Sequence, residues 1–275
     1  MFGEALVPGY PFWIERTGGA RFNDKLQKNL YAHYVEQSVA IDDGDLDAVC
    51  AAAARHRIAV YLGVMERAVN RGGHSLYCSI VFIDADGRIG SVHRKLMPTH
   101  EERLVWAIGD GHGLRTHRIG PFTAGGLNCW ENWLPLVRAS LYAQGEDLHV
   151  ATWPGNLRNT QDLTRFIASE ARSFVVSVSG LMRRDDIGDD VPNATLLRET
   201  ADDVMADGGS CVAAPTGDWV LAPETGIESL RITRIDHQLV LEERQNLDVA
   251  GHYSRPDVTR LVVDRKRQAT AEFDD

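Results

Sequence analysis

The chain is expected to adopt an α/β or α+β fold, because segments of helical and of strand periodicity alternate along its 275 residues. Turn-forming clusters split two further segments into antiparallel pairs, so two sheets are expected. With 44% hydrophobic and 25% charged residues, the chain can bury one substantial core. We therefore expect a single domain over residues 1–275, with a polar C-terminal tail from about residue 260.

The first predicted elements are a helix, a strand and a hairpin. The helix has one apolar face, formed by Leu46, Val49, Cys50 and Ala53. A continuous apolar strand follows, and the turn cluster at residues 84–87 then joins two further strands. In chain order, these elements are a helix over 45–56, a strand over 58–64, and hairpin strands over 75–83 and 88–94. Lys95 therefore lies at or just beyond the end of a strand.

The second half of the chain continues the alternation. A helix that accepts Pro135 in its first turn runs to about Gln144, with Leu134, Val137 and Leu141 at helical spacing. Further elements are predicted in this order: a strand over 148–153, a helix over 162–173, a strand over 174–179, and a hairpin over 210–221 around residues 215–218.

Residues 125–135, with the sequence GGLNCWENWLP, set Cys129 between a predicted strand and a predicted helix. The paired glycines allow the backbone to tighten before the cysteine, and Asn132 can cap the helix. A thiol in front of a helix N-terminus faces unpaired N–H groups, which favour the thiolate and lower its pKa. Because a free cysteine is more often a small buried hydrophobe, this position makes Cys129 a candidate nucleophile and no more.

Three blocks of the sequence resemble, in the same order, those of one enzyme family. Residues 2–13 (FGEALVPGYPFW) resemble the nitrilase block that holds the catalytic glutamate, and residues 93–99 (HRKLMPT), continuing to Trp106, resemble the lysine block. Residues 128–132 (NCWEN) resemble the cysteine block, and the tryptophan after the cysteine favours nitrilases over amidases and carbamoylases. The chain thus resembles a nitrilase of the carbon–nitrogen hydrolase superfamily over nearly its whole length, including residues 251–258.

The resemblance implies an α-β-β-α sandwich and a homo-oligomer, either a dimer or a longer spiral joined through helices. It also implies an N-terminally shortened chain, because the strand–helix unit that ordinarily precedes the glutamate block is expected to be absent. Such a chain would expose a sheet edge, and Glu4 would lie on a terminus, where order is hardest to maintain.

The resemblance also assigns roles to individual residues. Cys129 would attack the nitrile carbon, with Glu4 as the general base and Lys95 stabilising the developing negative charge. Glu102 would position the lysine and the substrate, while Trp130 and Trp153 would border the substrate pocket. Read without the resemblance, Glu4 is a solvated terminal carboxylate, Lys95 is a surface lysine, and both tryptophans belong to the core.

The expected activity is hydrolysis of a small-molecule nitrile to the carboxylic acid and ammonia, without a cofactor. Two alternatives stay open: an amidase of the same superfamily, and a catalytically inactive, truncated assembly protein. The type of nitrile is left open as well, and it includes aliphatic, aromatic and arylacetonitrile substrates and cyanide.

Composition argues against several other classes of protein. The net charge of −10 offers no basic stripe for nucleic acid, and the short basic run Arg265–Arg267 is expected to be solvated. The four cysteines are widely scattered, which favours a reducing, cytoplasmic compartment. No apolar run is long enough for a membrane span, and no second ligand near His93 supports a metal site.

Overall fold

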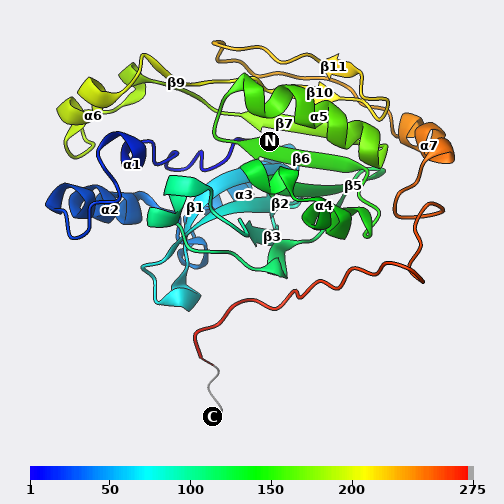
Figure 1. Cartoon of the computed structure of the whole chain (residues 1–275), viewed down its shortest axis with the longest axis horizontal. Coiled ribbons are helices and arrows are strands. Elements are labelled where there is room, and N and C mark those ends of the chain that lie inside the picture. The colour runs from blue at the N-terminus through cyan, green and yellow to red at the C-terminus, as the bar shows by residue number, and fades with distance from the viewer. Residues whose placement is uncertain (272–275) are drawn as a thin grey trace.

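The computed structural model describes residues 1–271 and contains two main sheets that lie one above the other (Figure 1). One sheet is antiparallel, with three strands in the order β1-β2-β3. The other has six strands in the order β11-β10-β7-β6-β5-β4, and β8 and β9 form a separate pair. The strand bounds are β1 Val60–Arg67, β2 Leu76–Ile83, β3 Ile89–Arg94, β4 His117–Ile119, β5 Phe122–Asn128, β6 Leu148–Trp153, β7 Phe174–Ser179, β8 Leu181–Arg183, β9 Val204–Asp207, β10 Cys211–Ala213 and β11 Trp219–Leu221.

Seven α-helices lie among the described residues, and two of them cover the outer faces of the sheets. Their bounds are α1 Trp13–Arg16, α2 Lys25–Gln37, α3 Asp47–His56, α4 Pro135–Tyr142, α5 Leu157–Ala171, α6 Ala194–Thr200 and α7 His237–Asn246. Within the described part of the chain, none has the length and hydropathy that crossing a bilayer requires.

The layers follow the order helix, sheet, sheet, helix, as the resemblance implies. Between the sheets, Tyr61 and Phe82 of the small sheet belong to one buried cluster with Phe122, Leu148 and Phe174 of the large sheet. A second cluster joins α3 to the outer face of the small sheet, and a third joins α5 to the outer face of the large sheet. The large sheet combines parallel pairing of β5, β6 and β7 with antiparallel pairing at both ends.

Most of the predicted elements are present. Strands β6 and β7 have the predicted bounds, and the pairs β2–β3 and β10–β11 are antiparallel hairpins. Helix α5 begins at Leu157 rather than at residue 162, because the Asn156 side chain accepts a hydrogen bond from the Arg158 N–H and caps an earlier start.

The N-terminal segment covers the outer edge of β1, so the expectation of an exposed edge there is wrong. The Phe2 N–H donates to the Tyr61 carbonyl at 2.9 Å, and the Val7 carbonyl accepts from the Met65 N–H at 2.8 Å. Gly63 permits this close approach, because a Cβ at that position would stand 2.0 Å from the Gly3 carbonyl oxygen. The segment therefore lies against the sheet as a partial additional strand.

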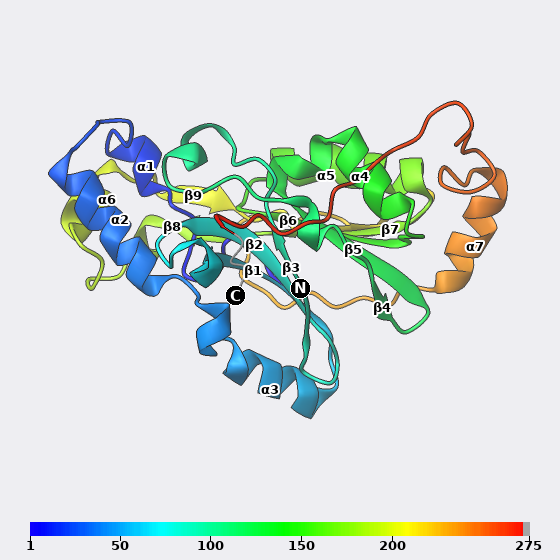
Figure 2. The same ribbon diagram turned by 90° about the horizontal axis from the view of Figure 1, so that it is seen from below.

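The C-terminal segment returns across the molecule from α7 to the neighbourhood of β3 (Figure 2). The Arg267 guanidinium donates to Asp110 Oδ1 and to the Val92 carbonyl, each at 2.9 Å. The Gln268 N–H donates to Asp110 Oδ2, also at 2.9 Å. Lys266 is exposed, but Arg267 is docked on a buried carboxylate, so the expectation of a solvated basic run is wrong for Arg267.

Candidate active site

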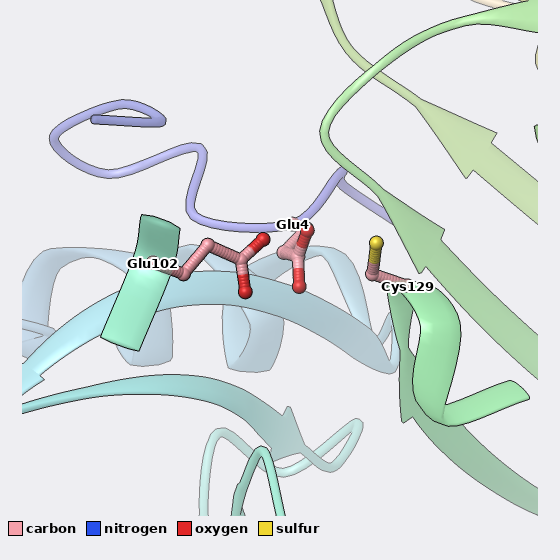
Figure 3. A group of neighbouring side chains, drawn as sticks. All are labelled: Glu4, Glu102 and Cys129. Atoms are coloured by element: carbon pink, nitrogen blue, oxygen red, sulfur yellow. The ribbon is translucent and has the colours of Figure 1, made fainter. Parts of the chain in front are cut away.

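Four side chains from distant parts of the sequence meet at one end of the two sheets. Lys95 Nζ lies 2.9 Å from Glu4 Oε1 and 2.7 Å from Glu102 Oε2. Figure 3 shows the carboxylates of Glu4 and Glu102 beside the thiol of Cys129, and one oxygen of each lies within 4.8 Å of Cys129 Sγ. All four side chains are buried. The structure thus brings together the four residues that the resemblance singles out.

Glu4 is held in place between the two sheets. Its N–H donates to the Trp153 carbonyl at the end of β6, while the segment around it is hydrogen-bonded to β1. The side chain of Cys78 on β2 donates to Glu4 Oε1 at 3.4 Å. Glu4 is only 3% exposed, so the expectation of a poorly held, solvated carboxylate is wrong.

Lys95 and Glu102 form one hydrogen-bonded unit. Lys95 follows β3 directly, and its ammonium lies 5.3 Å from the centre of the Trp106 ring. The Glu102 carboxylate receives three donors, which are Lys95 Nζ, the Thr99 N–H at 2.6 Å and the Tyr10 hydroxyl at 3.0 Å. Because every one of these donors is fixed, Glu102 holds the lysine in a single position.

Cys129 occupies a tight corner between strand β5 and a 3-10 helix (Cys129–Trp133). Its φ of +46° lies in the left-handed region, which is costly for any residue other than glycine. The helix is capped by Asn128, because Glu131 Oε2 accepts from the Asn128 N–H at 3.0 Å to complete a capping box. The predicted cap at Asn132 is wrong; its amide instead donates to the Cys129 carbonyl at 2.8 Å.

The paired glycines before the cysteine lie inside β5 and make room for neighbouring side chains. A Cβ at Gly125 would stand 2.2 Å from Glu146 Oε1, and one at Gly126 would stand 3.2 Å from the Tyr61 ring. Neither glycine has a positive φ, so the expectation that they tighten the backbone is wrong. The backbone turns at Cys129 itself.

Glu131, beside Cys129, is hydrogen-bonded to residues on both sides of Lys95. Its Oε1 accepts from the Leu96 N–H at 2.8 Å, and its Oε2 lies 2.9 Å from His93 Nε2. Burial alone would raise the pKa of Glu131, but His93 and the two backbone donors outweigh burial and lower it. The pair is fully buried and fixes the spacing between Lys95 and Cys129.

The pKa of Cys129 is raised in the structure, so the expectation that it is lowered is wrong. Burial, followed by the charge of Glu4, raises the pKa of Cys129 well above its ordinary value, although Lys95 and the Trp130 N–H act in the opposite direction. Burial also raises the pKa of Glu4 to about 7, with Lys95 limiting the shift. Burial alone would lower the pKa of Lys95, but Glu4, Cys129 and Glu102 together raise it well above its usual range. The resting thiol is therefore protonated, beside a carboxylate that titrates near neutrality.

The two tryptophans expected at a substrate pocket lie in different surroundings. Trp130 is 54% exposed on the 3-10 helix. Trp153 is fully buried against α5, and its Nε1 donates to Ser177 Oγ at 3.3 Å. Its indole packs in the same buried cluster as Cys129, and its contact with a substrate stays a prediction, whereas its carbonyl holds Glu4. Tyr10, which the sequence does not single out, lines a surface hollow of about 180 Å³ beside Glu102.

A metal ion does not fit among these carboxylates. Glu4, Glu102 and Cys129 together would offer three ligand atoms, but the ammonium of Lys95 already lies between the two carboxylates. A cation placed there would face the lysine charge at close range. The site therefore has the composition of a cysteine-dependent hydrolase, with a thiol, a base and a buried cation.

Comparison with known proteins agrees with this composition. The sequence profile described as carbon–nitrogen hydrolase matches residues 1–245, and the chain belongs to that family. A protein named Nitrilase 2, from an unidentified prokaryote, is 36% identical over 276 residues, covering 100% of this chain and 84% of its own length. An aliphatic nitrilase from Sinorhizobium fredii is 32% identical, covering 97% of this chain and 84% of its own length.

Among solved structures, the carbon–nitrogen hydrolase of Helicobacter pylori superposes with a TM-score of 0.62. The match covers 80% of this chain and 78% of the other, at 18% sequence identity. This likeness confirms the sandwich fold, and it carries no information on the substrate.

Proposed function

We propose that the chain is a nitrilase, which converts a small organic nitrile and two water molecules into a carboxylic acid and ammonia. The convergence of Cys129, Glu4 and Lys95 in one buried site carries this proposal. Similarity to proteins named as nitrilases over nearly the whole chain supports it.

In the first step, Glu4 removes the thiol proton as Cys129 Sγ attacks the nitrile carbon. The carbon–sulfur bond forms, one carbon–nitrogen π bond breaks, and the proton moves from Glu4 to nitrogen to give a thioimidate. The ammonium of Lys95 and the N–H of Trp130 stabilise the charge that develops on nitrogen. Both groups act at full strength because the site is buried.

In the second step, Glu4 removes a proton from water, and the resulting hydroxide adds to the thioimidate carbon. The proton held by Glu4 and the hydroxyl proton of the tetrahedral intermediate pass to nitrogen. The carbon–oxygen double bond then forms as the carbon–nitrogen bond breaks, so that ammonia leaves and a thioester remains on Cys129. A second water, activated by the same carboxylate, releases the acid and returns the proton to the thiol. Glu102 does not exchange protons in this scheme, because its carboxylate is saturated with donors and serves to hold Lys95 and Tyr10.

The test is ammonia and acid release from a panel of aliphatic, aromatic and arylacetonitrile substrates and cyanide, each organic nitrile matched with its amide. Replacement of Cys129 by alanine is expected to abolish release, whereas Cys50→Ala, on the remote helix α3, leaves it intact. Cys129-dependent turnover of the amides alone would identify an amidase. A folded wild-type chain that releases nothing from either series would favour the inactive assembly protein.

A cytoplasmic, reducing location also belongs to this proposal. All four cysteines are free, and Cys78, Cys129 and Cys211 are buried. Fractionation of the native host with detection by antibody tests the location. Recovery of the protein outside the cytoplasm would contradict it.

A further inference from the structure

A chain of three buried polar side chains ends on the carbonyl of the candidate nucleophile, Cys129. Asn132 follows Cys129 on the 3-10 helix, His149 is on β6, and Glu146 lies just before that strand. His149 Nε2 is 2.7 Å from Asn132 Oδ1, and His149 Nδ1 is 3.0 Å from Glu146 Oε1. All three are fully buried, and the proposed reaction uses none of them.

The hydrogen-bond donors in this chain can be assigned from the contacts. The Asn132 amide nitrogen donates to the carbonyls of Leu127, at 3.2 Å, and Cys129, at 2.8 Å, so its Oδ1 is the atom that faces His149. An amide oxygen only accepts hydrogen bonds, so His149 Nε2 must carry a proton. The other ring nitrogen, Nδ1, lies against Glu146 Oε1, which holds the ring in place.

The burial of this chain is expensive, which argues against a role in packing alone. Glu146 Oε2 has no hydrogen-bond partner among the described residues, and a buried carboxylate is costly even when paired. Gly125 provides the space for it, since any side chain there would collide with Glu146 Oε1. From β1, the Tyr61 ring packs over the adjacent Gly126. Apolar side chains of the same volume would fill this space at lower cost.

The chain of side chains acts on the peptide bond between Cys129 and Trp130. In a trans peptide the carbonyl and the N–H point in opposite directions. The hydrogen bond that Asn132 donates to the Cys129 carbonyl therefore also fixes the direction of the Trp130 N–H. That N–H favours the thiolate of Cys129. The same hydrogen bond also holds Cys129 in its left-handed conformation, which is unfavourable without support.

We propose that His149 is a positioning residue which, anchored by Glu146, orients Asn132 so that the Cys129–Trp130 peptide stays aimed at the reacting nitrile. The inference rests on the proposed nitrilase activity for its kinetic readout. The critical contact is the donor that His149 presents to Asn132, and the contact with Glu146 serves to hold the ring.

Two substitutions at position 149 separate these contacts. A glutamine amide nitrogen reaches the position of Nε2, so His149→Gln keeps the donor to Asn132. An asparagine amide reaches only the position of Nδ1, so His149→Asn keeps the contact with Glu146 and loses Asn132. We expect His149→Asn to lower kcat about 30-fold with KM within about twofold, and His149→Gln to retain kcat within about fivefold. Equal losses in both variants, or losses that follow their melting temperatures, would overturn the proposal.

A measurement on the wild-type chain needs neither activity nor a folded variant. Among the described residues, His93 and His149 are the buried histidines, and His93 Nδ1 has no hydrogen-bond partner. In histidine-¹⁵N-labelled protein, the His149 ring, which unlike that of His93 is hydrogen-bonded at both nitrogens, is expected to carry on Nε2 a proton that is protected from exchange. A His149 ring that carries its proton on Nδ1 alone lacks the assigned donor, and the proposal then fails. This result is independent of whether nitriles are hydrolysed.

Discussion

At the scale of single residues, Cys129 and Glu4 complement each other. A thiol whose pKa is raised by burial needs a base that is free of its proton at working pH. Glu4, with a pKa of about 7, is such a base, and it accepts a proton more readily than an ordinary carboxylate. The proposed reaction therefore depends on proton transfer at the moment of attack and not on a thiolate formed beforehand.

This dependence predicts the pH profile. Because the base acts only when deprotonated, kcat/KM should fall as pH decreases through about 7, the pKa of Glu4 in the free protein. Glu4→Gln should lower kcat/KM about 1,000-fold, since the amide cannot accept the proton. Steady-state rates from pH 5 to 9 check both expectations, with circular dichroism confirming that the variant is folded. A wild-type profile that stays flat down to pH 5 would contradict the assignment of Glu4.

Tyr10 is a residue whose contribution only the structure reveals. Its hydroxyl donates to Glu102 beside the surface hollow. Tyr10→Phe should lower kcat/KM about tenfold, because a hydrogen bond to a charged group is lost. Tyr31→Phe is the matched control, since the Tyr31 hydroxyl contacts the His74 carbonyl at an exposed position. A Tyr10→Phe variant with unchanged kinetics would show that the two other donors, Lys95 and the Thr99 N–H, suffice to hold Glu102.

At the scale of elements, the packing of the N-terminal segment on β1 determines where Glu4 lies. Gly63→Ala should displace this segment, because the new Cβ would meet the Gly3 carbonyl oxygen. We expect kcat/KM to fall at least about 100-fold while the sheets remain folded. Gly90→Ala, in β3 of the same sheet, meets the rings of Phe82 and His117 and should change kcat/KM less than about threefold. Similar losses in the two variants would mean that general damage to the sheet is responsible.

The sequence predicts those helices and strands in which the buried positions are occupied by many apolar residues. Strands β6 and β7 are rich in apolar, β-branched and aromatic residues, so their bounds follow from local composition. Helices α2 and α7 were not predicted, because only Leu30 and Tyr34 are buried in the first and Val240 in the second. A helix with so narrow an apolar face has little periodicity to detect.

The candidate site was predictable only in part, and for a related reason. The motifs of the resemblance identify Glu4, Lys95, Glu102 and Cys129, which the structure brings together. The supporting contacts join residues that are far apart in sequence, such as Tyr10 with Glu102. The raised pKa of Cys129 follows from burial by the whole fold, whereas the local helix N-terminus suggested the opposite shift.

At the scale of the whole molecule, the C-terminal segment fastens one side of the small sheet. Arg267→Ala should lower the free energy of unfolding by about 2 kcal/mol, because it leaves the buried Asp110 with fewer donors. Lys266→Ala, at the adjacent exposed position, should change it by less than about 0.5 kcal/mol. Urea denaturation of the two variants measures the difference. Equal stabilities would mean that the segment is not docked in solution.

Self-association is a further prediction for the whole molecule. Leu134 and Leu136 are exposed beside the candidate site, and their apolar surface suits a second copy of the chain. Light scattering is expected to give a mass of at least twice 30.5 kDa. Leu136→Lys should shift the mass towards that of the single chain, whereas Leu230→Lys, at an exposed position on the remote segment before α7, should not. A single-chain mass for the wild type at micromolar concentration would contradict the prediction.

The burial of Cys129 also bears on the chemical durability of the protein. Hydrogen peroxide and most oxidants attack thiolates, and a thiol whose pKa is raised offers them very little of that form. In the absence of substrate, the thiol of Cys129 would therefore stay reduced in aerated solution. Oxidative damage would fall first on more exposed sulfur, such as the thioether of Met97.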